Sequence, residues 1–154
     1  YINISEKYNF ASERKASFLK NLKKNKIRFN KDYYASVKLE EPEKSFEIIK
    51  KMLSKNKKIT SIICSTEFSA LSAIKACNFL NLEIGKDISI ITFDGPLVKD
   101  LSSPPITAIS FPVQELGKRA IKILLKGGSN KKHYSNFQAK SEIIERGSVH
   151  QVGG

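Results

Sequence analysis

The sequence contains only two cysteines and two histidines, and it has no apolar run long enough to cross a membrane. A transmembrane helix needs about 20 mainly apolar residues, so no membrane partner is expected. Residues 1–9 also lack the basic start and apolar stretch of a secretory signal. Cys64 and Cys77 match no CxxC or metal-ligand spacing, so we expect two buried free thiols and no metal site.

Sequence motifs of the common enzyme classes are absent as well. No GxSxG, GxxxxGK[ST], HExxH or GxGxxG pattern occurs. His133 and His150 have no motif partner and are expected on the surface. Asp94 and Glu67 can be imagined as an acid and base pair, but their spacing does not distinguish them from ordinary loop carboxylates. We therefore expect no enzymatic activity, no catalytic residue and no cofactor.

Positive charge is abundant. The chain has 27 Lys and Arg against 15 Asp and Glu, which gives a formal net charge of +12, and only four of the basic residues are arginines. Such a surface can bind nucleic acid because binding releases counterions from the phosphate backbone. The lysines are spread along the expected helices and loops with few aromatic residues among them, which favours a solvated lysine-rich surface. Binding of arbitrary DNA with a steep salt dependence remains the alternative.

Strand and helix patterns alternate along a chain of 154 residues, the length of one ordinary domain. Short apolar runs predict strands at residues 1–5, 33–39, 59–65 and 88–93. Helices are expected between these strands. The first runs from Ser12 to about residue 25, and the third runs from Glu67 to about residue 80 with Thr66 as its cap. The second begins at Pro42 and is expected to bury Phe46, Ile49, Met52 and Leu53. Helices of crossover length between strands predict a right-handed parallel α/β sheet.

The remaining residues follow a different pattern. Pro104-Pro105 leads into a short strand at residues 108–111 and a helix at 112–126, which Gly127-Gly128 ends. A polar loop at 130–135 and a last strand at 139–145 come next. The helix carries one apolar stripe made of Val113, Leu116, Ala120, Ile123 and Leu124.

Polar residues follow the ends of three predicted strands: Arg14 after the first, Thr66 and Glu67 after the third, and Asp94 after the fourth. The carboxyl ends of parallel strands open onto a crevice where ligands bind. An Arg and an Asp there would supply donors and acceptors for a polyhydroxylated or heterocyclic ligand. These residues also have structural interpretations: Asp94 before Gly95 suits a turn, Glu67 suits a helix N-terminus, and Arg14 suits an exposed first helical turn.

Several blocks of the sequence resemble the LacI/GalR family of bacterial transcription regulators. The most specific are residues 60–73, 84–94, 103–107 and 112–117, which occur in the order and spacing typical of that family. The segment from Arg14 to Phe18 resembles its Arg-x-x-Gly-Phe helix start, and Ile143 to Ser148 its closing strand. The similarity covers nearly the whole chain and is to the ligand-binding half of these regulators.

The resemblance implies an α/β fold: a parallel-sheet, Rossmann-like lobe of the periplasmic-binding-protein-like type I fold, with an incomplete second lobe. Residues 1–103 would form the C-terminal effector-binding lobe. Residues 104–128 would be a crossover strand and helix of the other lobe, 129–149 a return segment with the closing strand, and 150–154 a tail or tag remnant.

The resemblance also implies a function: the effector-sensing and dimerising part of a cytoplasmic regulator or repressor, in which operator DNA is bound only by a domain outside this chain. A sugar or related metabolite is the expected effector. The residues matched to effector contacts are Arg14, Thr66, Glu67, Asp94 and, at the crossover between lobes, Phe111. The residues matched to the family's homodimer interface are Leu71, Ile74, Lys75, Pro96, Leu97 and Leu101.

Four positions depart from the family pattern: Ser17 replaces a usual Gly, Thr66 a frequent Asn, Glu67 a usual Asp, and Gly95 a frequent second Asp. These departures leave the identity of the effector open. A solute-binding protein that feeds a transporter, built from the same lobes, is the alternative function.

Overall fold

A computed structural model of the chain describes residues 1–94, 101–126 and 138–150. The elements in chain order are β1 (Ile2–Ile4), α1 (Asn9–Lys24), the 3-10 helix η1 (Lys31–Tyr33), β2 (Ala35–Val37), α2 (Pro42–Lys55), β3 (Ser61–Cys64), α3 (Glu67–Phe79), β4 (Ser89–Phe93), β5 (Thr107–Ser110), α5 (Val113–Lys126) and β6 (Glu142–Ile144). The strands form one sheet in the order β2-β1-β3-β4-β5-β6. Neighbours from β2 to β5 pair in parallel, so the predicted α/β fold with a mostly parallel sheet is confirmed.

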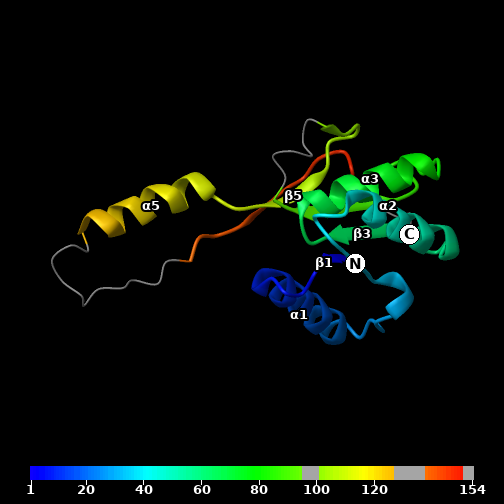
Figure 1. Ribbon diagram of the computed structural model, residues 1–154, viewed down its shortest axis with the longest axis horizontal. Coiled ribbons are helices and arrows are strands. Elements are labelled where there is room, and N and C mark those ends of the chain that lie inside the picture. Colours follow the sequence, from blue (N-terminus) through cyan, green and yellow to red (C-terminus); the bar gives the residue numbers. More distant parts are fainter. Residues whose placement is uncertain (95–100, 127–137, 151–154) are drawn as a thin grey trace.

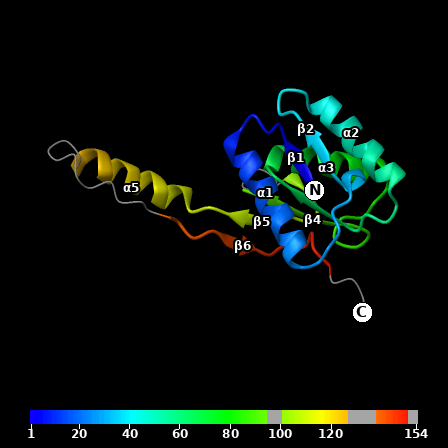
Figure 2. The same cartoon turned by 90° about the horizontal axis from the view of Figure 1, so that it is seen from below.

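Helices cover both faces of the sheet. Figures 1 and 2 show α1 on one face and α2 with α3 on the other. The helices that connect successive parallel strands pack against the two faces of the sheet and enclose the central strands. Ile2, Ile62 and Ile90 on these strands are at most 2% exposed. Such nearly continuous apolar strands are expected in a parallel sheet with two covered faces.

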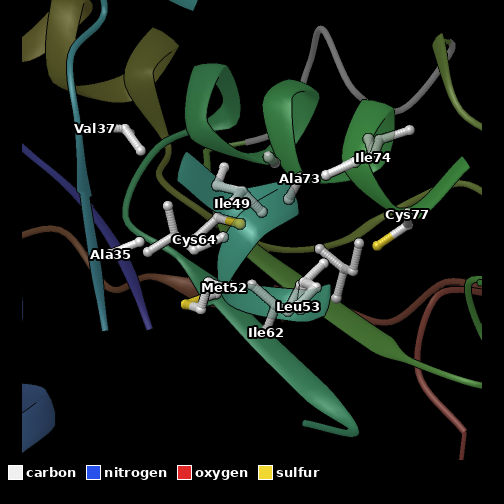
Figure 3. Close-up of a cluster of buried hydrophobic side chains, with 14 of the residues drawn as sticks. Ala35, Val37, Ile49, Met52, Leu53, Ile62, Cys64, Ala73, Ile74 and Cys77 are labelled. Atoms are coloured by element: carbon white, nitrogen blue, oxygen red, sulfur yellow. The ribbon is translucent and has the colours of Figure 1, made fainter. Parts of the chain in front are cut away.

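The core between the sheet and the pair α2 and α3 is shown in Figure 3. From α2 it receives the four residues predicted to be buried, Phe46, Ile49, Met52 and Leu53. Pro42 begins this helix as expected, because its fixed φ suits a first helical position and no intrahelical donor is lost there. Cys64 and Cys77 lie in the same core as buried free thiols, which confirms that prediction.

The start of α1 differs from the prediction. The helix begins at Asn9 rather than after Ser12, and Tyr8 precedes it without a side-chain cap. Ser12 instead donates its hydroxyl to the carbonyl oxygen of Asn9 at 3.1 Å, inside the helix. Ala11, completely buried, lies in the additional turn. Burial against the sheet therefore decides where the helix begins, and the capping preference of serine does not.

The second strand is also shorter than predicted. Residues 31–33 form η1, in which the Asn30 side chain accepts a hydrogen bond from the Asp32 backbone N–H at 2.9 Å. This local turn competes with an extended backbone. As a result β2 keeps only Ala35–Val37, with Ala35 and Val37 buried and Ser36 exposed.

The segment from β5 to β6 forms an arm that projects from the rest of the molecule. Figures 1 and 2 show α5 standing apart from the sheet, with the chain leaving along β5 and returning along β6. This return explains why β6 pairs antiparallel with β5, an orientation that the sequence pattern did not predict. All residues of α5 from Val113 to Leu125 are exposed, including the predicted apolar stripe. The predicted loop at 130–135, with His133, lies outside the described residues.

The residues after β6 return to the sheet. Ser148 is fully buried, donates to the carbonyl oxygen of Ile90 at 2.6 Å and accepts from the N–H of Thr107 at 2.8 Å. His150, expected on the surface, is half-buried and its Nδ1 lies 3.0 Å from the Ser89 hydroxyl. In the described parts of the chain, no helix combines the length and the apolar character that a membrane crossing requires.

Candidate functional site

Arg14 and Asp94 meet at the carboxyl edge of the sheet, as predicted. Arg14 lies in the second turn of α1, which follows β1, and Asp94 follows β4 directly. The Arg14 Nη2 atom is 3.7 Å from Asp94 Oδ2, and Nη1 donates to the backbone carbonyl of Ser65 after β3. The Arg14 side chain is 17% exposed and that of Asp94 41%, so the carboxylate remains open to solvent.

Asp94 reaches this position through its backbone. Its φ of +59° lies in the left-handed region, which a non-glycine residue adopts rarely, Asp and Asn excepted. The Asp94 N–H donates to the carbonyl oxygen of Ile109 in β5 at 3.0 Å and so fixes the turn. The turn interpretation of Asp94 is therefore confirmed, and the turn directs the carboxylate toward Arg14. A ligand contact by Asp94 stays a prediction.

Three phenylalanine rings surround the Arg14 guanidinium. Its Cζ atom lies 4.4 Å from the ring centroid of Phe93, 5.0 Å from Phe10 and 5.7 Å from Phe111. A cation over an aromatic face is attracted by the ring quadrupole within about 6 Å. Arg14, Asp94 and these three rings are called the Arg14 cluster below.

The sequence analysis missed two members of the Arg14 cluster. Phe10 precedes Arg14 by four residues on α1, so one helical turn places both side chains on the same face. Phe93 directly precedes Asp94 at the end of β4. Both rings could have been predicted from the sequence. Phe10 lies on the same helix as Arg14, one turn before it, and Phe93 is the residue directly before Asp94.

Burial determines the electrostatics of the cluster. It lowers the pKa of the Arg14 guanidinium, and the nearby Asp94 carboxylate and Tyr1 hydroxyl act in the opposite direction. Arginine nevertheless stays charged at neutral pH, because its ordinary pKa is above about 12. The cluster therefore offers a half-buried cation, a partly exposed carboxylate and flat apolar rings, which together can hold a small molecule that carries hydroxyl or ring-nitrogen groups.

Thr66 has a structural role beside the cluster. Its hydroxyl accepts from the Ser69 N–H at 3.2 Å and the Ser69 hydroxyl accepts from the Thr66 N–H at 3.2 Å, which is a reciprocal capping box for α3. The predicted cap is confirmed. Thr66 is only 8% exposed, while Glu67 in the first turn of α3 is half-buried. Effector contacts by these two residues stay predictions.

A shallow surface depression runs along the beginning of α5. Its lining residues are Phe111, Pro112, Val113, Gln114, Glu115 and Lys118. Phe111 also faces Arg14, so the predicted crossover position borders both the cluster and the arm.

The residues matched to a homodimer interface have different environments. Ile74 is 8% exposed and belongs to the core, while Lys75 binds both carboxylate oxygens of Glu43 on α2 at 2.9 and 3.0 Å. Leu71 is half-buried and Leu101 is 66% exposed. Pro96 and Leu97 lie outside the described residues.

Metal and thiol chemistry find no support in the described residues. Nowhere in residues 1–94, 101–126 and 138–150 do three or more His, Cys, Asp or Glu side chains gather as metal ligands would. Burial raises the pKa of both Cys64 and Cys77 to about 12, so neither thiol is a reactive nucleophile at neutral pH.

The chain is similar to transcription regulators in sequence. It is 35% identical over 105 residues to the HTH-type transcriptional repressor PurR of Aliivibrio salmonicida, which covers 68% of this chain and 32% of that protein. It is 34% identical over 97 residues to the HTH-type transcriptional regulator MalR of Streptomyces coelicolor, covering 62% of this chain and 28% of that protein. The chain thus spans about a third of the length of these relatives.

The fold is similar to that of solved LacI-family structures. The Escherichia coli transcriptional repressor ascG superposes with a TM-score of 0.82 at 22% identity, covering 97% of this chain and 54% of that one. The lac repressor dimer bound to operator and the anti-inducer ONPF superposes with a TM-score of 0.81 at 21% identity, covering 97% and 51%. At such identities the match concerns the fold.

Residues 2–149 match the family described as periplasmic binding protein-like domain. This match extends over nearly the whole chain, and the relatives that share the sequence are LacI-type, HTH-containing regulators rather than enzymes. The chain belongs to the periplasmic binding protein-like domain family, and its similarity is to the effector-binding region of LacI-family transcriptional regulators.

Proposed function

We propose that the chain is the effector-binding and dimerising region of a cytoplasmic DNA-binding transcription regulator, and that a small, sugar-like molecule binds at the Arg14 cluster. The operator would be read by a helix-turn-helix segment outside these residues. The named relatives support this proposal, because they are HTH-type regulators of which the chain spans about a third.

The ion pair between Arg14 and Asp94 is the observation that carries the proposal. Two residues 80 positions apart meet at the carboxyl edge of a parallel sheet, where ligands of such folds bind. Asp94 adopts a positive φ to reach this place. Aspartate tolerates this backbone conformation better than most residues, so it suits this turn.

The composition of the cluster favours a ligand with hydroxyl groups and a flat apolar face. The Asp94 carboxylate can accept hydrogen bonds from hydroxyls, and free N–H groups of Arg14 can donate to ring or hydroxyl oxygens. Phe10, 41% exposed, presents a face on which a sugar ring or heterocycle can pack. The effector would act by binding one arrangement of the protein better than another and so shifting their populations.

Residues 104–128 are proposed to belong to a second lobe that closes over this site. The apolar stripe of α5 supports this, since Val113 is 67% and Leu124 77% exposed. An amphipathic helix normally buries such a stripe against another element. The depression that begins at Phe111 would then lie between the two lobes.

The proposed dimer would use the outer face of α3. Phe68 and Phe79 on that helix are 52% and 63% exposed, and with Leu71 they follow helical spacing along one side. Leu101, 66% exposed, would be a further apolar contact of this dimer.

The effector proposal is tested by calorimetric titration of the full-length regulator with a panel of mono- and disaccharides and nucleobases. For the ligand that binds, we expect Asp94→Asn and Arg14→Lys each to weaken the affinity by about tenfold to a hundredfold, because a hydrogen bond to a charged group contributes about 1.5–3 kcal/mol. Glu40→Gln, which removes an exposed partner of Lys7 and Tyr8 instead, is the matched control and should leave the affinity unchanged.

Sedimentation of the same variants separates the two parts of the proposal. Asp94→Asn should abolish or weaken effector binding while the protein still sediments as a dimer. An unchanged affinity in Asp94→Asn would remove this carboxylate from the site, and a monomeric wild-type protein would refute dimerisation.

A further inference from the structure

Most of the net positive charge lies in two short stretches. Residues 20–33 and 51–60 together contain ten Lys and Arg and a single acidic residue, Asp32, and so account for +9 of the formal net charge of +12. The rest of the chain is nearly balanced. The sequence-based interpretation that this excess is spread along helices and loops rather than clustered is therefore wrong for these two stretches.

The fold brings these two stretches to one end of the molecule. Because α1 and α2 each follow a parallel strand and run back across the sheet, their C-terminal ends both lie at the edge where the strands begin. The Asn56 side chain, just after α2, donates to the carbonyl oxygen of Asp32 at 3.3 Å and joins the two stretches directly. Figure 1 shows this end of the molecule on the side away from α5. We call it the basic end.

The cations of the basic end are exposed, and Asp32 is the single acidic residue of the two stretches. These cations are Lys20, Lys23, Lys24, Lys26, Arg28, Lys31, Lys51, Lys55, Lys57 and Lys58. Lysines elsewhere, such as Lys38, Lys75 and Lys86, form ion pairs, whereas among the described residues none of these ten does. Lysines in a last helical turn complement the helix dipole, but Lys26, Arg28 and Lys57 lie outside the helices and have no such role.

We propose that the basic end binds the phosphate backbone of duplex DNA without reading its sequence. Nine of its ten cations are lysines, which act as flexible point charges suited to phosphate contacts, and only Arg28 offers the bidentate fork that base recognition favours. Tyr33, 37% exposed, is the one aromatic ring of the basic end that is more than a third exposed. A binding site for single strands would need several rings for base stacking.

The basic end is separate from the Arg14 cluster, because the two lie at opposite edges of the sheet. Its attraction to DNA would therefore be additional to specific operator recognition and independent of the effector. It would act through counterion release, which keeps a protein close to any DNA and weakens steeply with salt.

The test is fluorescence anisotropy of the 154-residue chain with a labelled duplex of arbitrary sequence, measured from 50 to 200 mM NaCl. For contacts to about six phosphates we expect the affinity to fall about a thousandfold across this range. Two competitors are added to the complex of protein and labelled duplex: a DNA single strand of the same length, and poly-glutamate. Each should displace the labelled duplex less well than unlabelled duplex does.

Two variants with equal loss of charge locate the site. In the first, four cations of the basic end are neutralised, with Lys23→Gln, Arg28→Gln, Lys55→Gln and Lys57→Gln. The matched control neutralises four exposed lysines that form ion pairs elsewhere, with Lys7→Gln, Lys38→Gln, Lys44→Gln and Lys86→Gln. Circular dichroism confirms that both are folded.

The first variant should lower the slope of log affinity against log salt by about 3 to 4, since each lost phosphate contact removes about 0.9. The control variant should keep the slope of the wild type. Equal weakening in both variants, or no duplex binding at 50 mM NaCl, would overturn the proposal. Tighter binding of poly-glutamate would assign the basic end to an acidic protein partner instead, and tighter binding of the single strand would refute the preference for duplex DNA.

Discussion

The cap of α3 gives the most direct test of the structural reasoning. Substituting Thr66→Ala removes the hydroxyl that accepts from the Ser69 N–H at 3.2 Å. Loss of an N-cap costs about 1 kcal/mol on average, with a range of about 0.5–2. Thr66 is 8% and Ser69 1% exposed, so water does not readily replace the lost acceptor and the buried N–H stays unpaired. We therefore expect a loss near the upper end, about 2 kcal/mol.

Urea and thermal unfolding monitored by circular dichroism measure this loss. For a chain of this size, 1 kcal/mol shifts the Tm by about 2–4 °C, so the Tm of Thr66→Ala should fall by about 4–8 °C. Thr66→Asn supplies another good capping oxygen and should stay within about 0.5 kcal/mol of the wild type. Ser72→Ala is the control, because the Ser72 hydroxyl makes only a 3.5 Å contact within the helix. A free energy of unfolding for Thr66→Ala within about 0.5 kcal/mol of the wild type would refute the role of the cap.

Two further predictions concern the core. Ile49 is fully buried, so Ile49→Ala should lower the free energy of unfolding by about 2–5 kcal/mol in urea titrations. Ile48 on the same helix is 42% exposed, so Ile48→Ala should lower it by less than about 1 kcal/mol. Equal losses would contradict the assignment of the buried and exposed faces of α2. Burial raises the pKa of Cys64 and Cys77 to about 12, so above pH about 8.5 the unfolded chain loses thiol protons that the folded chain keeps. Stability should therefore fall between pH about 8.5 and 12, by up to about 1.4 kcal/mol per pH unit for each thiol, and a variant with Cys64→Ala and Cys77→Ala should lose this part of the pH dependence.

The parallel part of the fold could be predicted from the sequence because its signals are local and repeated. Buried strands such as Ser89–Phe93 are short runs of β-branched residues, and α2 begins at Pro42 and buries one apolar face. The antiparallel direction of β6 could not be predicted in this way. It depends on how the chain returns from α5, which is a tertiary property that no local pattern of Glu142–Ile144 contains.

The site was predictable in part for a similar reason. Arg14 and Asp94 were identified because strand ends in a parallel sheet share one edge, and the structure brings them to 3.7 Å. The capping role of Thr66 was also readable from its place before an apolar helix. Phe10 was missed because α1 was expected to begin after it, and that boundary is determined by the burial of Ala11 rather than by a capping signal.

Of the three helices that cover the sheet, α1, which carries Arg14, is the least embedded in the core. Of the residues of α1 only Ala11 is buried, whereas α2 contributes five buried residues and α3 six. Segments with few buried apolar contacts open locally at a lower free energy than the global unfolding of the protein. The guanidinium is therefore held by an element that can detach while the sheet stays intact. A ligand that ties Arg14 to Asp94 would have to suppress this local opening, and part of its binding energy would be used in ordering α1.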